Sequence, residues 1–279
     1  MELIDIGCNL THDSFDSDRD EVIASAHAVG VVQMVVTGAS ETGSVKARDL
    51  AGQREGVLFA TAGVHPHLAA DFTSDTESVL AELHAEPNVV AVGECGLDYF
   101  RDFSPRPAQR KAFERQLELA VACSKPVFLH QRDAHEDFMA IMREFRPHLS
   151  RAVVHCFTDT RDAMLDYLAL DCHIGITGWI CDERRGHHLK EFVNEIPADR
   201  LMLETDAPYL KPRNLRPKVR THRNEPQWLP WIAGTVAACR DVTPDTLATQ
   251  TTACARNFFG LPAAGENGNR QAGNVKRET

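Results

Sequence analysis

The amino-acid sequence predicts an α/β fold of the (β/α)8 or TIM-barrel type, and three observations support this class. Short runs of β-branched and apolar residues alternate with segments of helical periodicity, and eight such runs can be counted along the chain. The length of 279 residues suits one eight-stranded α/β barrel, a domain of about 250 residues. Residues able to bind a divalent metal stand at the ends of four runs, where a parallel barrel carries its active site.

The eight expected strands are short and hydrophobic, as strands buried on both faces are. We expect them at residues Leu3 to Leu10, Val31 to Gly38, Val57 to Val64, Asn88 to Glu94, Pro126 to His130, Arg151 to His155, Cys172 to Thr177 and Leu201 to Thr205. Alternation of strands with helices implies parallel strands joined by right-handed crossovers. Eight repeats of this unit favour closure into a barrel over an open sheet.

The segments between these runs carry helical signals. Arg19 to Val29 places apolar residues on one face and ends at Gly30, a common helix stop. The longest helix is expected over Pro107 to Ser124, which is rich in good helix formers. After the last strand, two helices at about Pro226 to Arg240 and Pro244 to Phe259 are expected to complete the outer ring.

The sequence predicts one folded domain followed by a tail. Residues 1–261 contain no linker of small and polar composition, so they are assigned to a single TIM-barrel hydrolase domain. From Pro262 the chain is polar and rich in glycine, which predicts a flexible tail over residues 262–279.

Composition limits the partners and the compartment. The net charge of −10 argues against a protein that wraps duplex DNA with its whole surface, although it allows local phosphate binding. No apolar stretch is long enough to cross a membrane, and the first residues lack the features of a secretory signal. None of the eight cysteines stands in a Cys-x-x-Cys pair, so reduced thiols are expected. We therefore expect a cytoplasmic protein, without a membrane partner and monomeric.

Four of the expected strands end in candidate metal ligands: Glu94, His130, His155 and Asp206. Carboxylates and imidazoles are the donors that a hydrolytic metal site uses. Each residue alone has a structural alternative, and Glu94 could instead pair with Arg132. Recurrence at equivalent positions of four strands favours a shared metal site, in which Glu94 can bridge two ions. We expect Glu94 and Asp206 also to be catalytic, with Asp206 orienting water or taking its proton.

Two more histidines and one more acid stand near this set. His65 and His67 flank Pro66 after the third strand, and the proline fixes their directions. His65 is placed among the catalytic residues, as a metal ligand, a proton donor to the leaving group or a phosphate contact, against a structural alternative. His67 is a candidate substrate contact. Glu204 points to the same side as Asp206 if strand alternation holds, and we interpret it as a packing or supporting residue.

A basic loop follows the eighth strand, on the side where barrel loops often bind phosphate. The segment from Lys211 to Arg223 holds six fixed positive charges in an otherwise acidic chain. A solvated surface loop is the alternative, but its position beside the expected metal favours contact with a polyanion. The candidate substrate contacts are Arg216, Lys218, Arg220 and, after the fifth strand, Arg132. Arg184 and Arg185 could extend this surface, and Trp179 and Tyr209 are candidate platforms for base stacking.

Six motifs in order resemble the TatD-type deoxyribonucleases. They are Ile4-Asp5-Ile6-Gly7-Cys8-Asn9-Leu10-Thr11, Ala62-Gly63-Val64-His65-Pro66-His67, Ala91-Val92-Gly93-Glu94-Cys95-Gly96-Leu97-Asp98, Val154-His155-Cys156-Phe157-Thr158, Gly175-Ile176-Thr177-Gly178 and Glu204-Thr205-Asp206-Ala207-Pro208-Tyr209-Leu210. The resemblance implies a TIM barrel of the metal-dependent hydrolase type that cleaves phosphodiester bonds from the 3′ end of single-stranded DNA. It places metal binding at Glu94, His130, His155 and Asp206, with His65 near the site.

The resemblance also limits the metal content. Many relatives begin their first strand with a His-x-His pair, whereas this chain and the TatD subgroup that it resembles lack it, here with Gly7-Cys8-Asn9. One or two divalent ions are therefore expected, with Mg²⁺ ranked first and Mn²⁺ or Zn²⁺ as alternatives. Single-stranded DNA is the expected substrate, and RNA is a second possibility.

Two other functions are considered. A barrel amidohydrolase or esterase acting on a small substrate would use the same metal apparatus. A noncatalytic barrel that binds nucleic acid or another partner would not need the complete set of metal ligands. The basic loop favours a polynucleotide substrate, because a small neutral molecule has no use for six clustered cations.

Overall fold

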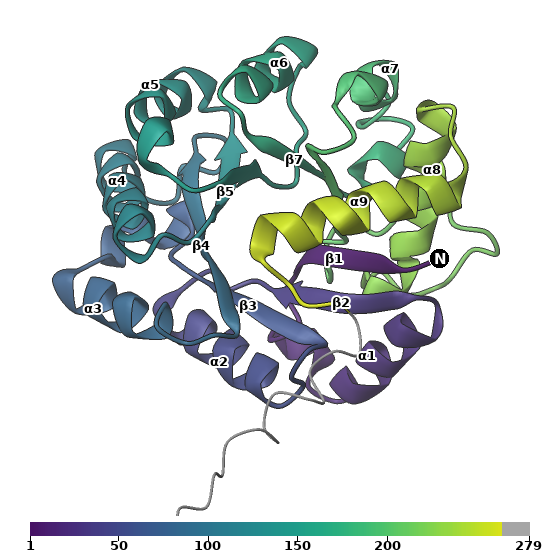
Figure 1. Cartoon of the computed structure of the whole chain (residues 1–279), viewed down its shortest axis with the longest axis horizontal. Helices are drawn as coiled ribbons and strands as arrows, with labels where there is room; N and C mark the ends of the chain where they lie inside the picture. The colour runs from purple at the N-terminus through teal and green to yellow at the C-terminus, as the bar shows by residue number, and fades with distance from the viewer. Residues whose placement is uncertain (264–279) are drawn as a thin grey trace, which may run out of the picture.

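The computed structural model describes residues 1–263 and has at its centre a barrel of eight parallel strands in sequence order (Figure 1). The strands are β1 Leu3–Cys8, β2 Val31–Val36, β3 Leu58–Ala62, β4 Val89–Asp98, β5 Val127–Arg132, β6 Ala152–Val154, β7 His173–Ile176 and β8 Leu201–Leu203. The last strand meets the first just beyond β8, where the Asp206 amide donates to the Gly7 carbonyl at 2.8 Å and the Asn9 amide donates to the Ala207 carbonyl at 2.7 Å. The predicted TIM-barrel class is confirmed.

Helices surround the barrel (Figure 1). The α-helices are α1 Arg19–Ala28, α2 Glu41–Gly52, α3 Ser74–Leu83, α4 Arg106–Cys123, α5 His135–Phe145, α6 Arg161–Ala169, α7 Leu189–Phe192, α8 Leu229–Cys239 and α9 Pro244–Phe259. Short 3-10 turns are η1 Asp13–Phe15, η2 Pro66–Asp71, η3 Arg146–His148, η4 Gly178–Cys181, η5 Val193–Glu195 and η6 Pro226–Trp228. Hydroxyl groups of Ser40, Thr73, Thr160 and Thr243 accept amide hydrogen bonds at the starts of α2, α3, α6 and α9. These caps satisfy backbone groups that a helix start leaves free.

Most expected elements differ from the observed ones by one or two residues at an end, and two differ by more. The helix predicted over Pro226 to Arg240 is divided into η6 and α8, because Pro230 lacks the amide hydrogen that a continuous helix would use and lies instead in the first turn of α8. The fourth strand was expected to end at Glu94 but continues to Asp98. Likewise, the fifth strand continues two residues beyond His130 to Arg132. Glu94 and His130 thus lie inside β4 and β5, and the prediction that they end their strands is wrong.

Helix α9 covers the end of the barrel at which the strands begin (Figure 1). Its Thr252 hydroxyl donates to the Glu2 carbonyl, and its Phe258 carbonyl accepts from Arg151, residues that directly precede β1 and β6. Apolar residues of α9 join strand residues in the cluster that fills the barrel, which includes Ile4, Ile6, Val35, Phe59, Phe128, Met202, Phe258 and Phe259. A second apolar cluster includes residues of the strands and of the surrounding helices. With this end covered, the opposite end is the one at which side chains can meet a ligand.

The described residues bear on several other predictions. Most of the predicted tail, residues 264–279, lies outside the described part of the chain; just before it, the Pro262 carbonyl accepts a hydrogen bond from Gln33 Nε2 at 3.0 Å. All eight cysteines are free thiols, as expected. Among the helices of residues 1–263, none has the length and apolar character needed to span a bilayer. The single-domain boundary, the compartment and the monomeric state stay predictions.

Candidate metal centre

A cavity of about 520 Å³ opens at the end of the barrel opposite α9. Its lining consists of Asn9, Ala39, His65, His67, Leu68, Glu94, Phe103, His130, His155, Cys156, Asp206 and Tyr209. All predicted metal ligands and both predicted histidines of the third loop are in this set. The fold therefore brings the residues selected from the sequence together around one cavity, with other lining residues that the sequence did not indicate. Their roles as metal ligands and catalytic residues stay predictions.

Glycines in β4 bring Glu94 close to β5. The pairing register of the two strands shifts between Val92 and Cys95. Gly93 and Gly96 have φ angles of 131° and 142°, and a Cβ there would lie 2.1 Å from the Phe128 carbonyl oxygen and 1.9 Å from that of His130. Only glycine fits such a close approach in this conformation. The irregular strand thus places the Glu94 carboxylate beside His130.

Three imidazoles converge on one oxygen of Glu94. Oε1 lies 2.8 Å from His155 Nε2, 3.1 Å from His130 Nδ1 and 3.4 Å from His65 Nε2. For Glu94, His65 and His130, one donor atom of each lies within 4.8 Å of the others. The side chains are largely buried, with 10% exposure for Glu94 and 3% for His155. Converging carboxylate and imidazole donors of this kind fit a divalent metal ion.

The charges of this cluster are strongly coupled. Burial alone would raise the pKa of Glu94, but His65, His155 and the hydrogen bonds of the imidazoles hold it well below its usual range. Burial opposes protonation of His155, yet Glu94 and Glu204 raise its pKa well above normal. Burial lowers the pKa of His65 to about 3. The charge of Glu94 is therefore coupled to the protonation of the imidazoles around it.

Asp206 lines the same cavity from the turn after β8. Its backbone has a φ of 52°, in the left-handed region that residues other than glycine rarely adopt. Burial is the main cause that raises the pKa of Asp206 to about 7, and the nearby carboxylates add to the rise. Asn9 Nδ2 donates a hydrogen bond to Asp206 Oδ1 at 3.0 Å, and this bond lowers the pKa of Asp206. Asp206 lines the cavity, and within residues 1–263 no hydrogen bond joins its carboxylate to Glu94 or to the imidazoles.

Two further carboxylates support the imidazoles. Asp98 Oδ2 lies 2.8 Å from His67 Nε2 and 3.3 Å from His130 Nε2. Glu204 Oε2 lies 3.2 Å from His155 Nδ1, which agrees with the supporting role predicted for it. Hydrogen bonds of this kind fix the ring orientation and tautomer of a metal-binding histidine. Asp98 was part of a quoted motif but was not predicted as a site residue.

Two buried glutamines of α4 hold the backbone around the site, and the sequence did not mark them. Gln116 accepts from the Val64 amide at 2.7 Å and donates to the Val64 carbonyl at 3.1 Å, which fixes the chain before His65. Gln109 accepts from the Asp98 amide at 2.9 Å and donates to the Asp98 carbonyl at 3.2 Å. Neither side chain completes a recognisable motif with its partner, which lies 52 residues away for Gln116 and 11 residues away for Gln109.

The predicted substrate contacts are divided among several places. His67 lines the cavity, whereas Arg132, Arg216, Lys218 and Arg220 lie outside its lining. Arg216 and Lys218 line a separate hollow of about 370 Å³ in the basic loop, together with Lys211, Arg213 and others. The structure therefore does not bring the basic loop into the metal cavity itself.

Half of the loop's six cations have partners inside the protein. Arg223 forms ion pairs with Asp18 and Glu225 at 2.6 and 2.9 Å, and Lys211 donates to carbonyl groups of the loop. Arg213 lies 3.8 Å from Asp182. Arg216, Lys218 and Arg220 are exposed and have no acidic partner among residues 1–263. These three, which the sequence analysis selected, are the ones available to an external polyanion.

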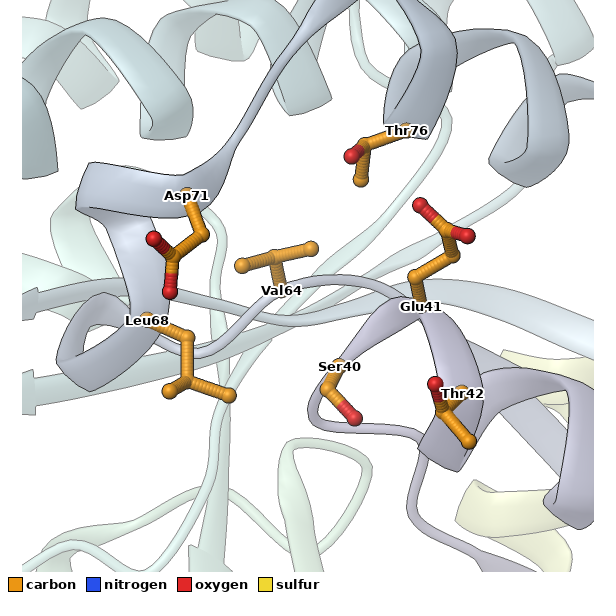
Figure 2. Close-up of a pocket in the computed structure, with 7 residues that line it drawn as sticks. All are labelled: Ser40, Glu41, Thr42, Val64, Leu68, Asp71 and Thr76. Carbon is orange, nitrogen blue, oxygen red and sulfur yellow. The ribbon is translucent and has the colours of Figure 1, made fainter.

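A smaller hollow of about 260 Å³ shares Leu68 with the cavity (Figure 2). Figure 2 shows Glu41 and Thr42 at the start of α2, Asp71 at the end of η2 and Thr76 of α3 around it. It has no imidazole in its lining and none of the predicted site residues. The metal chemistry is therefore assigned to the larger cavity.

Residues 4–260 match the sequence profile of the family described as TatD related DNase. The chain belongs to this TatD family. Curated relatives named 3′-5′ ssDNA/RNA exonuclease TatD include the protein of Erwinia billingiae, 49% identical over 94% of this chain and 100% of the relative, and that of Klebsiella pneumoniae, 46% identical over the same shares. The TatD resemblance inferred from the motifs is confirmed, and the chain is a hydrolase of that family.

Solved structures agree with the barrel of the TatD family. A TatD homologue of Escherichia coli K12 superposes with a TM-score of 0.84 at 24% identity, over 93% of this chain and 98% of its own. A TatD family hydrolase of Entamoeba histolytica gives 0.82 at 24% identity, over 94% and 99%. At such identities the likeness concerns the fold alone.

Proposed function

We propose that this protein is a divalent-metal-dependent 3′-5′ exonuclease that hydrolyses phosphodiester bonds of single-stranded DNA, and of RNA as a second substrate. The observation that carries the proposal is the convergence of three imidazole nitrogens on Glu94 Oε1 at the base of the open cavity. The names of the relatives support the substrate and the 3′-5′ polarity. The exposed cations of the basic loop support a polyanionic substrate.

The residues divide the work as follows. Glu94, His130 and His155 would hold one or two ions together with Asp206. His65 is neutral because burial lowers its pKa to about 3, so it serves better as a ligand than as a proton donor. When bound, a divalent ion polarises the scissile phosphate and lowers the pKa of water. Carboxylate oxygens suit Mg²⁺, and imidazoles also accept Mn²⁺ and Zn²⁺, so all three ions belong in the test.

Asp206 is the proposed base. One oxygen of its carboxylate accepts a hydrogen bond from Asn9, and the residue lines the cavity. The pKa of about 7 in the metal-free protein is close to the value at which a group can both lose and accept a proton near neutral pH. Asp206 would orient the attacking water and accept its proton. The exposed Arg216, Lys218 and Arg220 would hold the backbone of the strand outside the cavity.

The test is a metal series on one single-stranded oligonucleotide, labelled at its 3′ end in one sample and at its 5′ end in another. With Mg²⁺, Mn²⁺ or Zn²⁺, the 3′ label should leave first as a mononucleotide, while the 5′ label stays on a ladder of shortening products. A chelator should stop the reaction. RNA of the same sequence tests the second substrate. Cleavage of a simple ester or a cyclic amide, with no cleavage of either nucleic acid, would favour the small-substrate hydrolase instead.

Glu94→Gln ties the activity to the cavity. The change keeps the volume of the side chain but removes the negative charge that the three imidazoles surround, so cleavage should fall to the background level. Glu195→Gln is the matched control, because Glu195 pairs with Arg161 on the outside of the barrel. Full activity of a folded Glu94→Gln protein would remove this residue from the mechanism.

A further inference from the structure

We propose that the single strand leaves the catalytic cavity along a row of aromatic rings and guanidinium groups on the barrel rim. The aromatic-arginine row consists of Phe103, Phe100, Arg132, Trp179 and Arg185. The inference rests on the proposed nuclease function and adds to it the route of the strand upstream of the cleaved bond.

The row begins at the cavity with two exposed rings of the loop between β4 and α4. Phe103 lines the cavity, its ring centroid lies 4.8 Å from that of His67, and 69% of the residue is exposed. Phe100, three residues earlier, is 56% exposed. Rings this open bury little of their own surface, so the loop gains little stability from them. Two such rings beside a candidate active site are free to contact a ligand.

Arg132 continues the row on the neighbouring strand. Its guanidinium carbon lies 4.9 Å from the centroid of the Phe100 ring and 5.3 Å from that of Trp179. The guanidinium carbon of Arg185 lies 4.3 Å from the centroid of the same Trp179 ring. Cations and π faces therefore alternate across the ends of β4, β5 and β7. The nearest carboxylate of Arg132 is that of Asp133 at 3.8 Å, so its charge is only weakly compensated.

The row also reaches the basic loop. Asp182 Oδ2 accepts from Arg185 Nε at 2.9 Å and lies 3.8 Å from Arg213 Nε. Arg213 lines the hollow of the basic loop with Arg216 and Lys218. Because the basic loop itself stays outside the metal cavity, a strand held by both needs a surface between them. The row supplies that surface with residues of the β4–α4 loop, the end of β5 and the connection between β7 and α7.

Single-stranded nucleic acid fits this surface better than a duplex does. A single strand alternates bases, which can stack on aromatic rings, with phosphates, which arginines can neutralise. In a duplex the bases are paired and stacked on one another, so their faces cannot reach the rings. Stacking is also tolerant of sequence, as a nuclease that removes successive nucleotides requires.

The test compares substrate lengths in variants of the two exposed rings. Phe100→Ala and Phe103→Ala should each raise the KM for a ten-nucleotide oligo-dT about fivefold or more, the usual effect of removing one base-aromatic stack. The kcat should change little, because the rings do not touch the reacting bond. For Phe100→Ala the loss with a dinucleotide should be much smaller, since a dinucleotide is too short to reach Phe100. Phe100→Trp should keep the KM of the unchanged protein, in contrast to Phe100→Ala, because the larger ring can still stack on a base.

Leu165→Ala is the matched control, because Leu165 is an exposed apolar residue of α6 and should leave both substrates unaffected. A second measurement places the bases. One abasic nucleotide, moved stepwise from the 3′ end of the ten-nucleotide substrate, should raise the KM of the unchanged protein at one position or more. At that position the abasic substitution should have no further effect in the Phe100→Ala protein.

The failure of this inference differs from the failure of the proposed function. If the unchanged protein shortens the oligonucleotide and both ring variants keep its KM, the row is not the path of the strand and the nuclease function stands. An equal loss for dinucleotide and ten-nucleotide substrates in the Phe100→Ala protein would overturn the row as well. If no nucleic acid is cleaved with any of the three ions, the row and the proposed function fall together.

Discussion

Glu204 and Glu94 contact opposite nitrogens of His155, and Glu204 fixes this imidazole from the side away from the cavity. Its Oε2 lies 3.2 Å from His155 Nδ1, while Oε1 accepts the amide of Cys156. Two glycines leave room for the buried carboxylate, since a Cβ at Gly7 would lie 2.4 Å from Oε2 and one at Gly175 would lie 2.6 Å from Oε1. This arrangement keeps Nδ1 protonated, so Nε2 is the nitrogen that can bind an ion.

Glu204→Gln should weaken metal binding about 10- to 100-fold, as loss of a carboxylate behind a ligating histidine usually does. An amide can offer an N–H group to Nδ1 and so favour the tautomer whose proton blocks Nε2. Titration calorimetry with Mn²⁺ or Zn²⁺ measures the change, and Glu195→Gln is the control on the outer surface. Equal affinities in both variants would contradict a role for Glu204 in orienting His155.

Metal binding should release protons near pH 7. The pKa of His155 is raised well above its usual value and that of His130 is also raised, so the metal-free protein holds protons that an ion must displace. Affinity should therefore increase with pH until both imidazoles are neutral. Calorimetry in two buffers of different ionisation enthalpy gives the number of protons released. A binding heat that is independent of the buffer would show that the imidazoles are already neutral.

Asn9→Ala should shift the acid limb of the pH-rate profile to higher pH. The amide of Asn9 donates to Asp206 and lowers its pKa, so its removal raises the pKa of the group that must be ionised to accept a proton. The kcat/KM profile at saturating metal measures this, and the plateau at high pH should be largely retained. An acid limb that stays in place would indicate that Asp206 is not the base.

The alternation of strand and helix was enough to predict the barrel, because each buried strand is a run of apolar residues that differs clearly from its amphipathic neighbours. Strand ends were less predictable. Glu94 lies inside β4 because the chain continues past it through Gly93 and Gly96, whose close approach to β5 depends on the partner strand. From the sequence alone, a glycine such as Gly93 or Gly96 is compatible with the end of a strand and also with a close approach to a neighbouring strand.

Apart from Glu204, the residues that support the candidate ligands were not predicted from the sequence. Asn9 meets Asp206, and Gln116 meets Val64, across distances of 197 and 52 residues along the chain. Such contacts follow from the closed barrel rather than from any local pattern. For the same reason the sequence did not show which cations of the basic loop are paired. Arg223 forms an ion pair with Asp18, which comes from the other end of the chain.

Neutralising Arg216, Lys218 and Arg220 together to glutamine should weaken binding of single-stranded DNA and reduce its salt dependence. If each cation neutralises one phosphate, the slope of log K against log salt should become less steep by about 2. Fluorescence anisotropy at several salt concentrations measures it. Lys111→Gln with Arg143→Gln on the outer helices is the control and should leave the slope unchanged. An unchanged slope in the triple variant would make the loop a solvated surface without a role in binding.

Phe258→Ala should destabilise the protein without altering its metal site. Phe258 is fully buried, and its ring packs against His173 at 4.8 Å and Phe259 at 4.6 Å at the end of the barrel that α9 covers. Loss of this ring removes apolar contacts and leaves a cavity that the surrounding strands cannot fill, which typically costs about 3–5 kcal/mol. Urea unfolding measures the free energy of unfolding, with Leu165→Ala as the exposed control. Because the metal centre lies at the opposite end, metal affinity of the folded variant should be retained. A loss of affinity larger than the loss of stability would mean that α9 also shapes the ligand geometry.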